Sequence, residues 1–233
     1  MFKKFFRLIS ICLLLVLCNC SSDEIVLTQC GPFDTSSLTS SQELFLDLTF
    51  GQNFGSSTDR LKKWNSNIRY TVFGNPTPED LMMLESVINE INSRNNPIVL
   101  IPSEDPFLAQ HIIYFGTTES YIDQIEPLAA GFAEGLPGFT AIRWNNAYEI
   151  SSASICIDNV NYPDAADVEH IIKEELGHSL GLINDTSLST ESIFHESIQN
   201  QEYSTQDLEL IDLMLGYVIS PGLCASETIE ALN

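Results

Sequence analysis

One segment of the sequence combines acidic and imidazole side chains at a spacing that suits metal binding and catalysis. In residues 171–185, IIKEELGHSLGLIND, Glu174 and His178 are four residues apart. On a helix this spacing places both side chains on one face, with β-carbons about 5–6 Å apart, so that both reach one ion. Glu175 lies about 100° around the helix from Glu174, where its carboxylate reaches a water molecule held by that ion. The segment therefore predicts a metal site with Glu175 as general base.

The residues after this predicted helix can complete the site. Gly181 ends the helix and turns the chain back, and Asp185 is the expected third ligand, with the Asn184 side chain as the alternative. One imidazole with one or two carboxylates is a harder ligand set than three imidazoles, so it selects zinc less sharply over manganese or iron. Anionic ligands also acidify a bound water less than neutral imidazoles do. We therefore expect zinc or another divalent metal, and slower hydrolysis than at a three-histidine site.

The segment resembles the active-site helix of metzincins, zinc peptidases with the motif HExxHxxGxxH. In that comparison Glu174 replaces the first histidine, Glu175 is the general base and His178 is the second histidine. Asn184 stands where metzincins have the third histidine. Their Met-turn, of the form SIM, is matched by residues 192–194, Ser-Ile-Phe. The resemblance implies a zincin ancestry with altered ligands.

A closer resemblance is to a bacterial family of domains of unknown function, whose signature is similar to EELxQxLGLxND, then SIF, a helix and a proline–glycine pair. That family often has glutamine where this chain has His178, so a strong zinc site is not a general property of such proteins. The residues that match its signature are Glu174, Glu175, Gly181, Asn184, Asp185, Ser192, Phe194, Pro221 and Gly222. The resemblance to metzincins covers about residues 68–221. It implies an α+β, zincin-like fold: a mixed twisted sheet, a long backing helix, an active-site helix and a small C-terminal helical subdomain.

The elements that must position the site follow from the spacing of apolar residues. Helices are predicted over residues 78–94 after a Thr77 cap, over the motif after Asp164 or Asp167, and over 208–215 after a capping box at residues 204–207. The predicted strands are Glu43–Phe50, Ile68–Gly74, Pro97–Ile101, His111–Gly116, Phe139–Trp144 and Ile150–Ile157. The predicted order, a strand, a long helix, several strands and then the motif helix, resembles that of the metzincin upper subdomain.

The first residues resemble a bacterial lipoprotein signal peptide. A basic start is followed by the apolar run 9–17, which is too short to span a bilayer as a stable anchor. Residues 17–20, Leu-Cys-Asn-Cys, resemble a lipobox in which Cys20 becomes the acylated N-terminus, although Asn19 is unusual there and Cys18 is an alternative. The Ser-Ser-Asp-Glu that follows is similar to the acidic tag of surface-exposed Bacteroidota lipoproteins.

This leader predicts a domain order and a location. Residues 1–19 are a signal peptide, residues 20–67 are a tether and N-terminal extension, and residues 68–233 are the metzincin-like domain. We expect a lipid anchor in the outer membrane, on its periplasmic or its surface side, and membrane contact through that anchor only. The alternative is a secreted protein that is cleaved near the same place.

The charge of the chain restricts its partners. The leader holds three of the ten basic residues and no acidic residue, so the remaining chain has seven basic and 32 acidic residues and a net charge of −25. Such a chain repels polyanions, and nucleic acid is therefore not an expected partner. More than 200 residues with 44% hydrophobic content are sufficient for one domain with an ordinary core.

Three cysteines remain after the leader and the acylated cysteine are set aside. Cys30, Cys156 and Cys224 lie in an oxidising compartment, where one disulfide can form and one thiol is left over. Their spacing does not choose among the three pairings. No CxxC occurs, which argues against a cysteine zinc site.

Three hypotheses about function follow. The first is an envelope-anchored metallopeptidase that hydrolyses a peptide bound along the strand Phe139–Trp144, with metal-activated water and Glu175 as general base. The second is a catalytically inactive zincin-fold lipoprotein that binds a peptide, a glycan or an envelope partner, since both outer histidines and the Met-turn methionine are replaced. In the third, Glu174, Glu175 and Asp185 are structural and accept hydrogen bonds from backbone amides around the Gly181 turn, and His178 is a packing residue. His170, one turn before Glu174, and His195, after Phe194, are further candidates near the site.

Overall fold

A five-stranded sheet forms the centre of the fold. The computed structural model of the 233-residue chain describes residues 30–56, 59–197 and 199–233. The strands lie in the order β2-β1-β3-β5-β4, and all neighbouring pairs are parallel except β4 and β5. Within the described residues, β4 is therefore an edge strand next to its only antiparallel neighbour. The bounds are Ile68–Gly74 (β1), Leu100–Pro102 (β2), His111–Phe115 (β3), Gly138–Trp144 (β4) and Ile150–Ile157 (β5).

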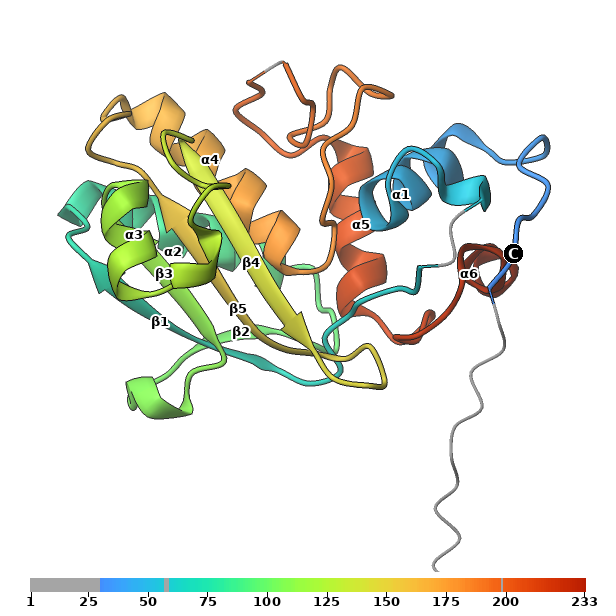
Figure 1. Cartoon of the computed structure of the whole chain (residues 1–233), viewed down its shortest axis with the longest axis horizontal. Helices are drawn as coiled ribbons and strands as arrows, with labels where there is room; N and C mark the ends of the chain where they lie inside the picture. Colours follow the sequence, from blue (N-terminus) through green and yellow to red (C-terminus); the bar gives the residue numbers. More distant parts are fainter. Residues whose placement is uncertain (1–29, 57–58, 198) are drawn as a thin grey trace, which may run out of the picture.

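Helices cover both faces of this sheet (Figure 1). On one face α2 (Pro78–Asn92) and α4 (Ala165–Ser179) pack against each other, and α4 contacts β4 and β5. The short α3 (Thr118–Gln124) packs on the other face, where Tyr121 joins a small cluster with Tyr114 and Cys156. Short 3-10 helices follow α1, β2 and α3; they are η1 (Phe54–Ser56), η2 (Pro106–Leu108) and η3 (Pro127–Ala129).

Three helices stand together beside the sheet, namely α1 (Ser40–Phe50), α5 (Thr205–Leu215) and α6 (Ala225–Leu232) (Figure 1). A disulfide joins Cys30 to Cys224, 194 residues apart in sequence, and so connects the chain before α1 to the start of α6. This is one of the three pairings that the sequence leaves open. Cys156 is a buried free thiol. In the part of the chain that the structure describes, no helix has the length and apolarity needed to cross a membrane.

The strand predicted over Glu43–Phe50 is wrong, because this segment is the helix α1. A capping box starts the helix: the Thr39 hydroxyl accepts from the backbone N–H of Gln42, and the Gln42 side chain accepts from the N–H of Thr39. Residues 44–49 are all buried, including Asp47. A helix that is buried all round shows no polar face in its sequence, so periodicity does not identify it.

The predicted fold class is confirmed. The chain is α+β, with a mixed sheet, the backing helix α2, the motif-bearing helix α4 and helices in the C-terminal part. Of the two candidate caps for α4, Asp164 is the N-cap and accepts from the N–H of Ala166. Strand β2 starts later than predicted, and α3 and α6 had no counterpart among the predicted elements. Cys20 and the predicted signal peptide 1–19 lie outside the described residues.

Candidate metal centre

Helix α4 presents one face to the core and another to a cleft. Its apolar face packs in the main hydrophobic core through Val168, Ile171, Ile172 and Leu176. The helix ends after Ser179, and Gly181 adopts a φ of 113°, a left-handed conformation that favours glycine. A Cβ on Gly181 would also lie 2.6 Å from the Lys62 carbonyl oxygen. The chain can therefore turn back over the helix only with glycine at this position.

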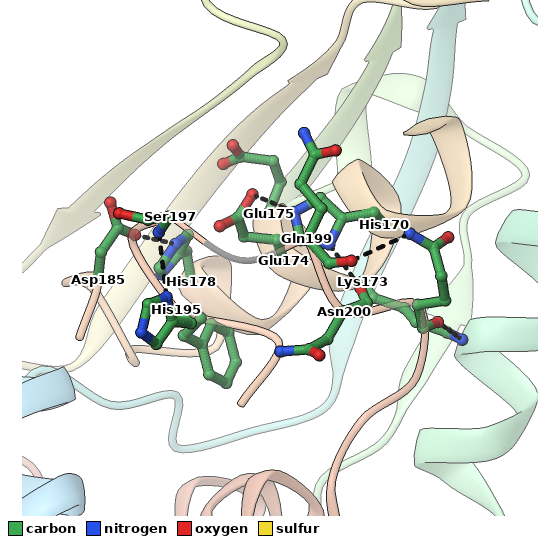
Figure 2. A network of polar contacts seen from close by, with 12 residues as sticks. His170, Lys173, Glu174, Glu175, His178, Asp185, His195, Ser197, Gln199 and Asn200 are labelled. Carbon is green, nitrogen blue, oxygen red and sulfur yellow. Dashed lines mark hydrogen bonds and ion pairs between the residues drawn. The ribbon is translucent and has the colours of Figure 1, made fainter. Parts of the chain in front are cut away.

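The turn brings together three side chains that could ligate a metal. Glu174 and His178 on α4 and Asp185 after the turn each offer one donor atom, and these atoms lie within 4.8 Å of one another (Figure 2). The predicted ligand residues thus converge on one point. Glu174 is partly buried, His178 is buried and Asp185 is exposed, so the cluster is open to solvent on one side, as a site that receives a substrate must be.

The hydrogen bonds of His178 suit a metal ligand. Its Nδ1 donates to the carbonyl oxygen of Leu182, and its Nε2 lies 3.2 Å from an oxygen of Asp185. A ligating histidine commonly donates its other ring N–H to a backbone carbonyl, which fixes the ring orientation and leaves the second nitrogen for the metal. The residues present therefore fit a divalent metal with one imidazole and two carboxylate ligands.

Without a metal, His178 and Asp185 are an ion pair. Burial by itself lowers the pKa of His178, but the hydrogen bond with Asp185 and the charges of Glu175 and Glu174 outweigh burial and raise that pKa to about 9. The same hydrogen bond holds the pKa of Asp185 below its usual value. The charges of His178 and Asp185 thus compensate each other in the absence of a metal.

Glu175 is held against strand β4 rather than by its own helix. The Thr140 hydroxyl lies 2.6 Å from Glu175 Oε2, to which it can donate, and 3.0 Å from the Glu175 carbonyl oxygen. A Cβ on Gly138 would lie 2.4 Å from Glu175 Oε1, so only glycine leaves room for this carboxylate. Burial raises the pKa of Glu175 to about 7, with the charge of Glu174 acting in the same direction. A carboxyl group with a pKa near neutrality can both take up and release a proton at physiological pH.

Helix α1 holds both neighbours of Asp185. The backbone N–H and the side-chain amide of Asn184 both donate to the carbonyl oxygen of Leu48, at 3.0 and 3.1 Å. On the other side, the Thr186 hydroxyl donates to Asp47 Oδ2 at 2.6 Å, and both of these side chains are buried. The alternative ligand Asn184 is therefore directed to α1, and Asp185 is the residue left facing the cluster.

The Ser-Ile-Phe turn lies beneath His178. The Asp207 carboxylate, fully buried at the start of α5, accepts from the Ser192 hydroxyl at 2.6 Å and from the Ile193 N–H at 2.9 Å. This places the Phe194 ring 5.2 Å from the His178 ring, centroid to centroid. A Cβ on Gly177 would lie 2.4 Å from the Phe194 ring, so glycine is needed at this position too.

The two further histidine candidates have different positions. His170 is not one of the three converging ligands; its Nε2 lies 3.4 Å from Glu174 Oε2, and its Nδ1 contacts the Asn200 carbonyl oxygen at 2.7 Å. His195 lines the same cleft, and its Nδ1 accepts from the N–H of Ser197 at 3.1 Å. Neither residue is needed to complete the ligand set.

A cleft of about 740 Å³ lies over the cluster and runs along strand β4. The N–H of Asp158 donates to the carbonyl oxygen of Pro137, so these two residues are a hydrogen-bonded pair between the strands. Hydrogen-bonded and non-hydrogen-bonded pairs alternate along an antiparallel ladder. The backbone groups of Gly138, Thr140 and Ile142 therefore point away from β5. An extended peptide can pair with these groups. The cleft is lined by β4 and the preceding loop, by α4, and by the segments around Asp185 and His195; its side chains include Leu136, Phe139, His170, Glu174, Glu175, His178, Ile183, Asp185, His195 and Glu196.

Sequence reasoning identified the clustered residues on α4 but missed their supports on other elements. The sequence pattern predicts only a strand at Thr140, a loop at Gly138 and a strand at Asp47, and it gives none of these residues a role in the site. The only local signal for the support from β4 is a hydroxyl residue two positions after a glycine, at the start of an edge strand. It becomes informative only when the register of β4 against α4 is known.

A family model described as "Protein of unknown function (DUF2927)" matches residues 39–233. No curated protein matches the chain. Two solved structures of myroilysin are similar at 13% and 14% identity, with TM-scores of 0.44 and 0.45; the match covers 68% and 67% of this chain and 99% and 86% of theirs. High choriolytic enzyme 1, a hatching enzyme zinc-protease from Oryzias latipes (medaka fish), is similar at 11% identity with a TM-score of 0.41, covering 66% of this chain and 95% of that enzyme.

Proposed function

Because the chain belongs to the family described as "Protein of unknown function (DUF2927)", whose description assigns no activity, we propose a function from the site itself: metal-dependent hydrolysis of a peptide bond. The observation that carries the proposal is the convergence of Glu174, His178 and Asp185 donor atoms within 4.8 Å, in the cleft that also contains Glu175. Three protein ligands with an open side are the arrangement of catalytic, rather than structural, zinc sites.

The proposed mechanism assigns a role to each residue of the cleft. Glu174, His178 and Asp185 hold a divalent metal, zinc being the first candidate, which when bound polarises the substrate carbonyl and acidifies water. Glu175 takes the proton from the attacking water and delivers it to the leaving amine. The open edge of β4 binds the substrate as an extended strand, so that its backbone lies alongside Glu175.

The experiment combines metal analysis with one substitution. We expect the mature chain, purified without added ions, to contain about one equivalent of zinc or of another transition metal. Glu175→Gln should retain that metal while cleavage of a mixed quenched-fluorescent peptide library falls about 10²- to 10⁴-fold, the usual contribution of a general base. Glu174→Gln is the matched control on the adjacent position, and it should lose metal and activity together. Unchanged cleavage by Glu175→Gln would contradict the mechanism.

A second candidate function is binding without hydrolysis. It is favoured by the ion pair of His178 with Asp185 and by the hydrogen bond of Glu175 with Thr140, since these residues already satisfy one another without a metal. In that case the cleft and the β4 edge hold a peptide, a glycan or an envelope partner. Absence of transition metal and of cleavage, together with saturable binding of an extended peptide, would select this candidate.

The proposal includes a place in the bacterial envelope. The lipobox-like residues 17–20 support acylation of Cys20 and a lipid anchor in the outer membrane, on its periplasmic or its surface side. Metabolic labelling with a radioactive fatty acid should mark the wild-type chain and not Cys20→Ser. Label on the Cys20→Ser chain would contradict this assignment, and loss of label in Cys18→Ser would point to the alternative cysteine.

A further inference from the structure

His170 bridges a candidate ligand and a distant segment of the chain. It lies one helical turn before Glu174 and is 5% exposed. Its Nδ1 is 2.7 Å from the Asn200 carbonyl oxygen, and because a carbonyl oxygen only accepts, this nitrogen must donate. The Nε2 atom of the same ring faces Glu174 Oε2, 3.4 Å away, and donates to it when the ring is an imidazolium (Figure 2).

The position of Asn200 is itself determined by the turn beneath the cluster. Its side-chain amide donates to the Ser192 carbonyl oxygen at 2.7 Å and lies 3.1 Å from that of Thr190. Ser192 is anchored by the buried Asp207. A continuous set of contacts therefore runs from the Ser-Ile-Phe turn through Asn200 and His170 to the Glu174 carboxylate.

Glu174 depends on this contact for a fixed position. Within the described part of the chain, His170 is the one basic side chain in ion-pair contact with Glu174. A glutamate side chain has three rotatable bonds, and restricting them opposes metal binding unless a neighbour has already selected the binding orientation. By contrast, His178 is fixed by Leu182 and Asp185 is held through its own neighbours.

We infer that His170 is a positioning residue for the metal: it fixes the Glu174 carboxylate in the ligating orientation and couples it to the segment around Asn200. The inference rests on the proposed function, because Glu174 is a ligand only if the cleft binds a metal. It assigns no metal contact to His170 itself. Residues that orient a ligand in this way typically change metal affinity by 10- to 100-fold when they are replaced.

Lys173 provides a matched control. It is also buried on α4, and its Nζ donates to the Gln201 carbonyl oxygen at 2.6 Å. Among the described residues, the ion pairs of this ammonium join it to Glu202 at 2.7 Å and to Glu169 at 3.0 Å, not to the Glu174 carboxylate. The Tyr203 hydroxyl donates to the Lys173 carbonyl oxygen at 2.6 Å. The segment 199–203 therefore stays attached to α4 when either His170 or Lys173 is changed singly.

The test is the affinity for zinc, measured by competition with a chromophoric chelator on full-length protein in detergent. We expect His170→Leu to weaken zinc binding 10- to 100-fold, and Lys173→Met to change it less than threefold. His170→Gln, whose amide can donate to one of the two partners but not to both, should fall between. Circular dichroism and thermal melting show whether His170→Leu folds. If it does not, the zinc affinity of His170→Gln is compared with that of Lys173→Met instead.

Three outcomes overturn the inference, and they are distinguishable. Equal zinc affinities for the His170 and Lys173 variants would show that the contact has only a structural role. X-ray absorption of the zinc-loaded wild type should show one imidazole ligand, from His178. A second imidazole that is lost in His170→Leu would make His170 a ligand instead. A wild-type chain that binds no zinc would remove the proposed function first, and this inference with it.

Discussion

At the scale of single residues, the proposed general base Glu175 depends on a neighbour from another element. Glu175 belongs to α4, but its carboxylate is hydrogen-bonded to Thr140 on β4 and occupies the space left by Gly138. Because the backbone groups of Thr140 also face the open edge of the sheet, one residue touches both the base and the expected path of the peptide. Substrate alignment and orientation of the base are thus linked through one side chain.

Replacing Thr140 should therefore lower kcat more than it raises KM. A hydrogen bond to a charged group contributes about 1.5–3 kcal/mol, which corresponds to roughly a 10- to 100-fold decrease in kcat for Thr140→Val. Thr140→Ser keeps the hydroxyl and should retain most of the rate. Steady-state kinetics on one cleaved peptide make the comparison, and equal rates for the valine and serine variants would contradict the role given to the hydroxyl.

His111, on strand β3 and outside the cleft, is a second informative residue. It is fully buried, and neither ring nitrogen has a hydrogen-bond partner in the structure as described. Burial lowers its pKa from 6.5 to about 3, so the folded chain keeps it neutral where the unfolded chain takes up a proton. The free energy of unfolding is therefore not reduced by His111 above pH 6.5. It decreases as the pH falls from 6.5 towards 3, because the unfolded chain then binds a proton that the folded chain does not.

This predicts an acid sensitivity that one substitution removes. Each pH unit below 6.5 should cost the wild type about 1.4 kcal/mol of unfolding free energy through this residue, or about 2 kcal/mol at pH 5. His111→Leu should lose correspondingly less stability between pH 7 and pH 5. Urea unfolding of both chains at the two pH values measures the difference, and parallel losses would show that His111 is not neutral in the folded state.

At the scale of elements, α1 is part of the site although it lies more than 120 residues before it. The helix holds Asn184 through the Leu48 carbonyl oxygen and Thr186 through Asp47, and so determines where Asp185 points. Leu44, Phe45, Leu46 and Leu48 share the main core with the sheet and α4. The packed structure around the site therefore includes α1.

Asp47→Ala should weaken both folding and metal binding. Loss of the buried acceptor leaves the Thr186 hydroxyl unpaired, which costs about 1–3 kcal/mol of unfolding free energy, and Asp185 becomes less well ordered, which lowers zinc affinity. Thr49→Val is the control on the same helix, since among the described residues this buried hydroxyl bonds to the Phe45 carbonyl oxygen, within α1. Urea unfolding and zinc competition measure the two effects, and unchanged zinc affinity in Asp47→Ala would show that α1 does not position Asp185.

At the scale of the whole molecule, charge and covalent connection are the dominant features. Of the seven basic residues in the described chain, six are buried or in ion pairs, and Arg69 is exposed, so most of the acidic charge is uncompensated at the surface. Mutual repulsion of these acids destabilises the compact state. The disulfide between Cys30 and Cys224 opposes that effect by restricting the unfolded chain.

Reduction of this disulfide should lower stability by about 2–5 kcal/mol, in the range found for native disulfides that close long loops. The melting temperature of the wild type should fall on addition of dithiothreitol, whereas the double variant Cys30→Ser, Cys224→Ser should melt at the reduced temperature with or without it. Calorimetric or fluorescence melting makes the measurement. A wild-type chain indifferent to the reductant would contradict the pairing.

Local sequence patterns account for the features that depend on residues close together in the chain. The placement of Glu174, Glu175 and His178 on one helix follows from 3.6 residues per turn, and the strand Ile68–Gly74 follows from its period-two pattern. The capping boxes at Thr77 and Ser204 mark helix starts for the same local reason. The fold class and the part of the candidate site on α4 can thus be predicted from the sequence.

Which distant segments meet depends on tertiary packing. That Asp185 rather than Asn184 joins the cluster depends on α1, that Thr140 holds Glu175 depends on the register of β4, and that Cys30 pairs with Cys224 depends on where α6 lies. These contacts join residues far apart in sequence, and their free energy comes from the packing of whole elements against one core. No local pattern carries that information, because the same side chains at the same spacing would be compatible with several arrangements of those elements.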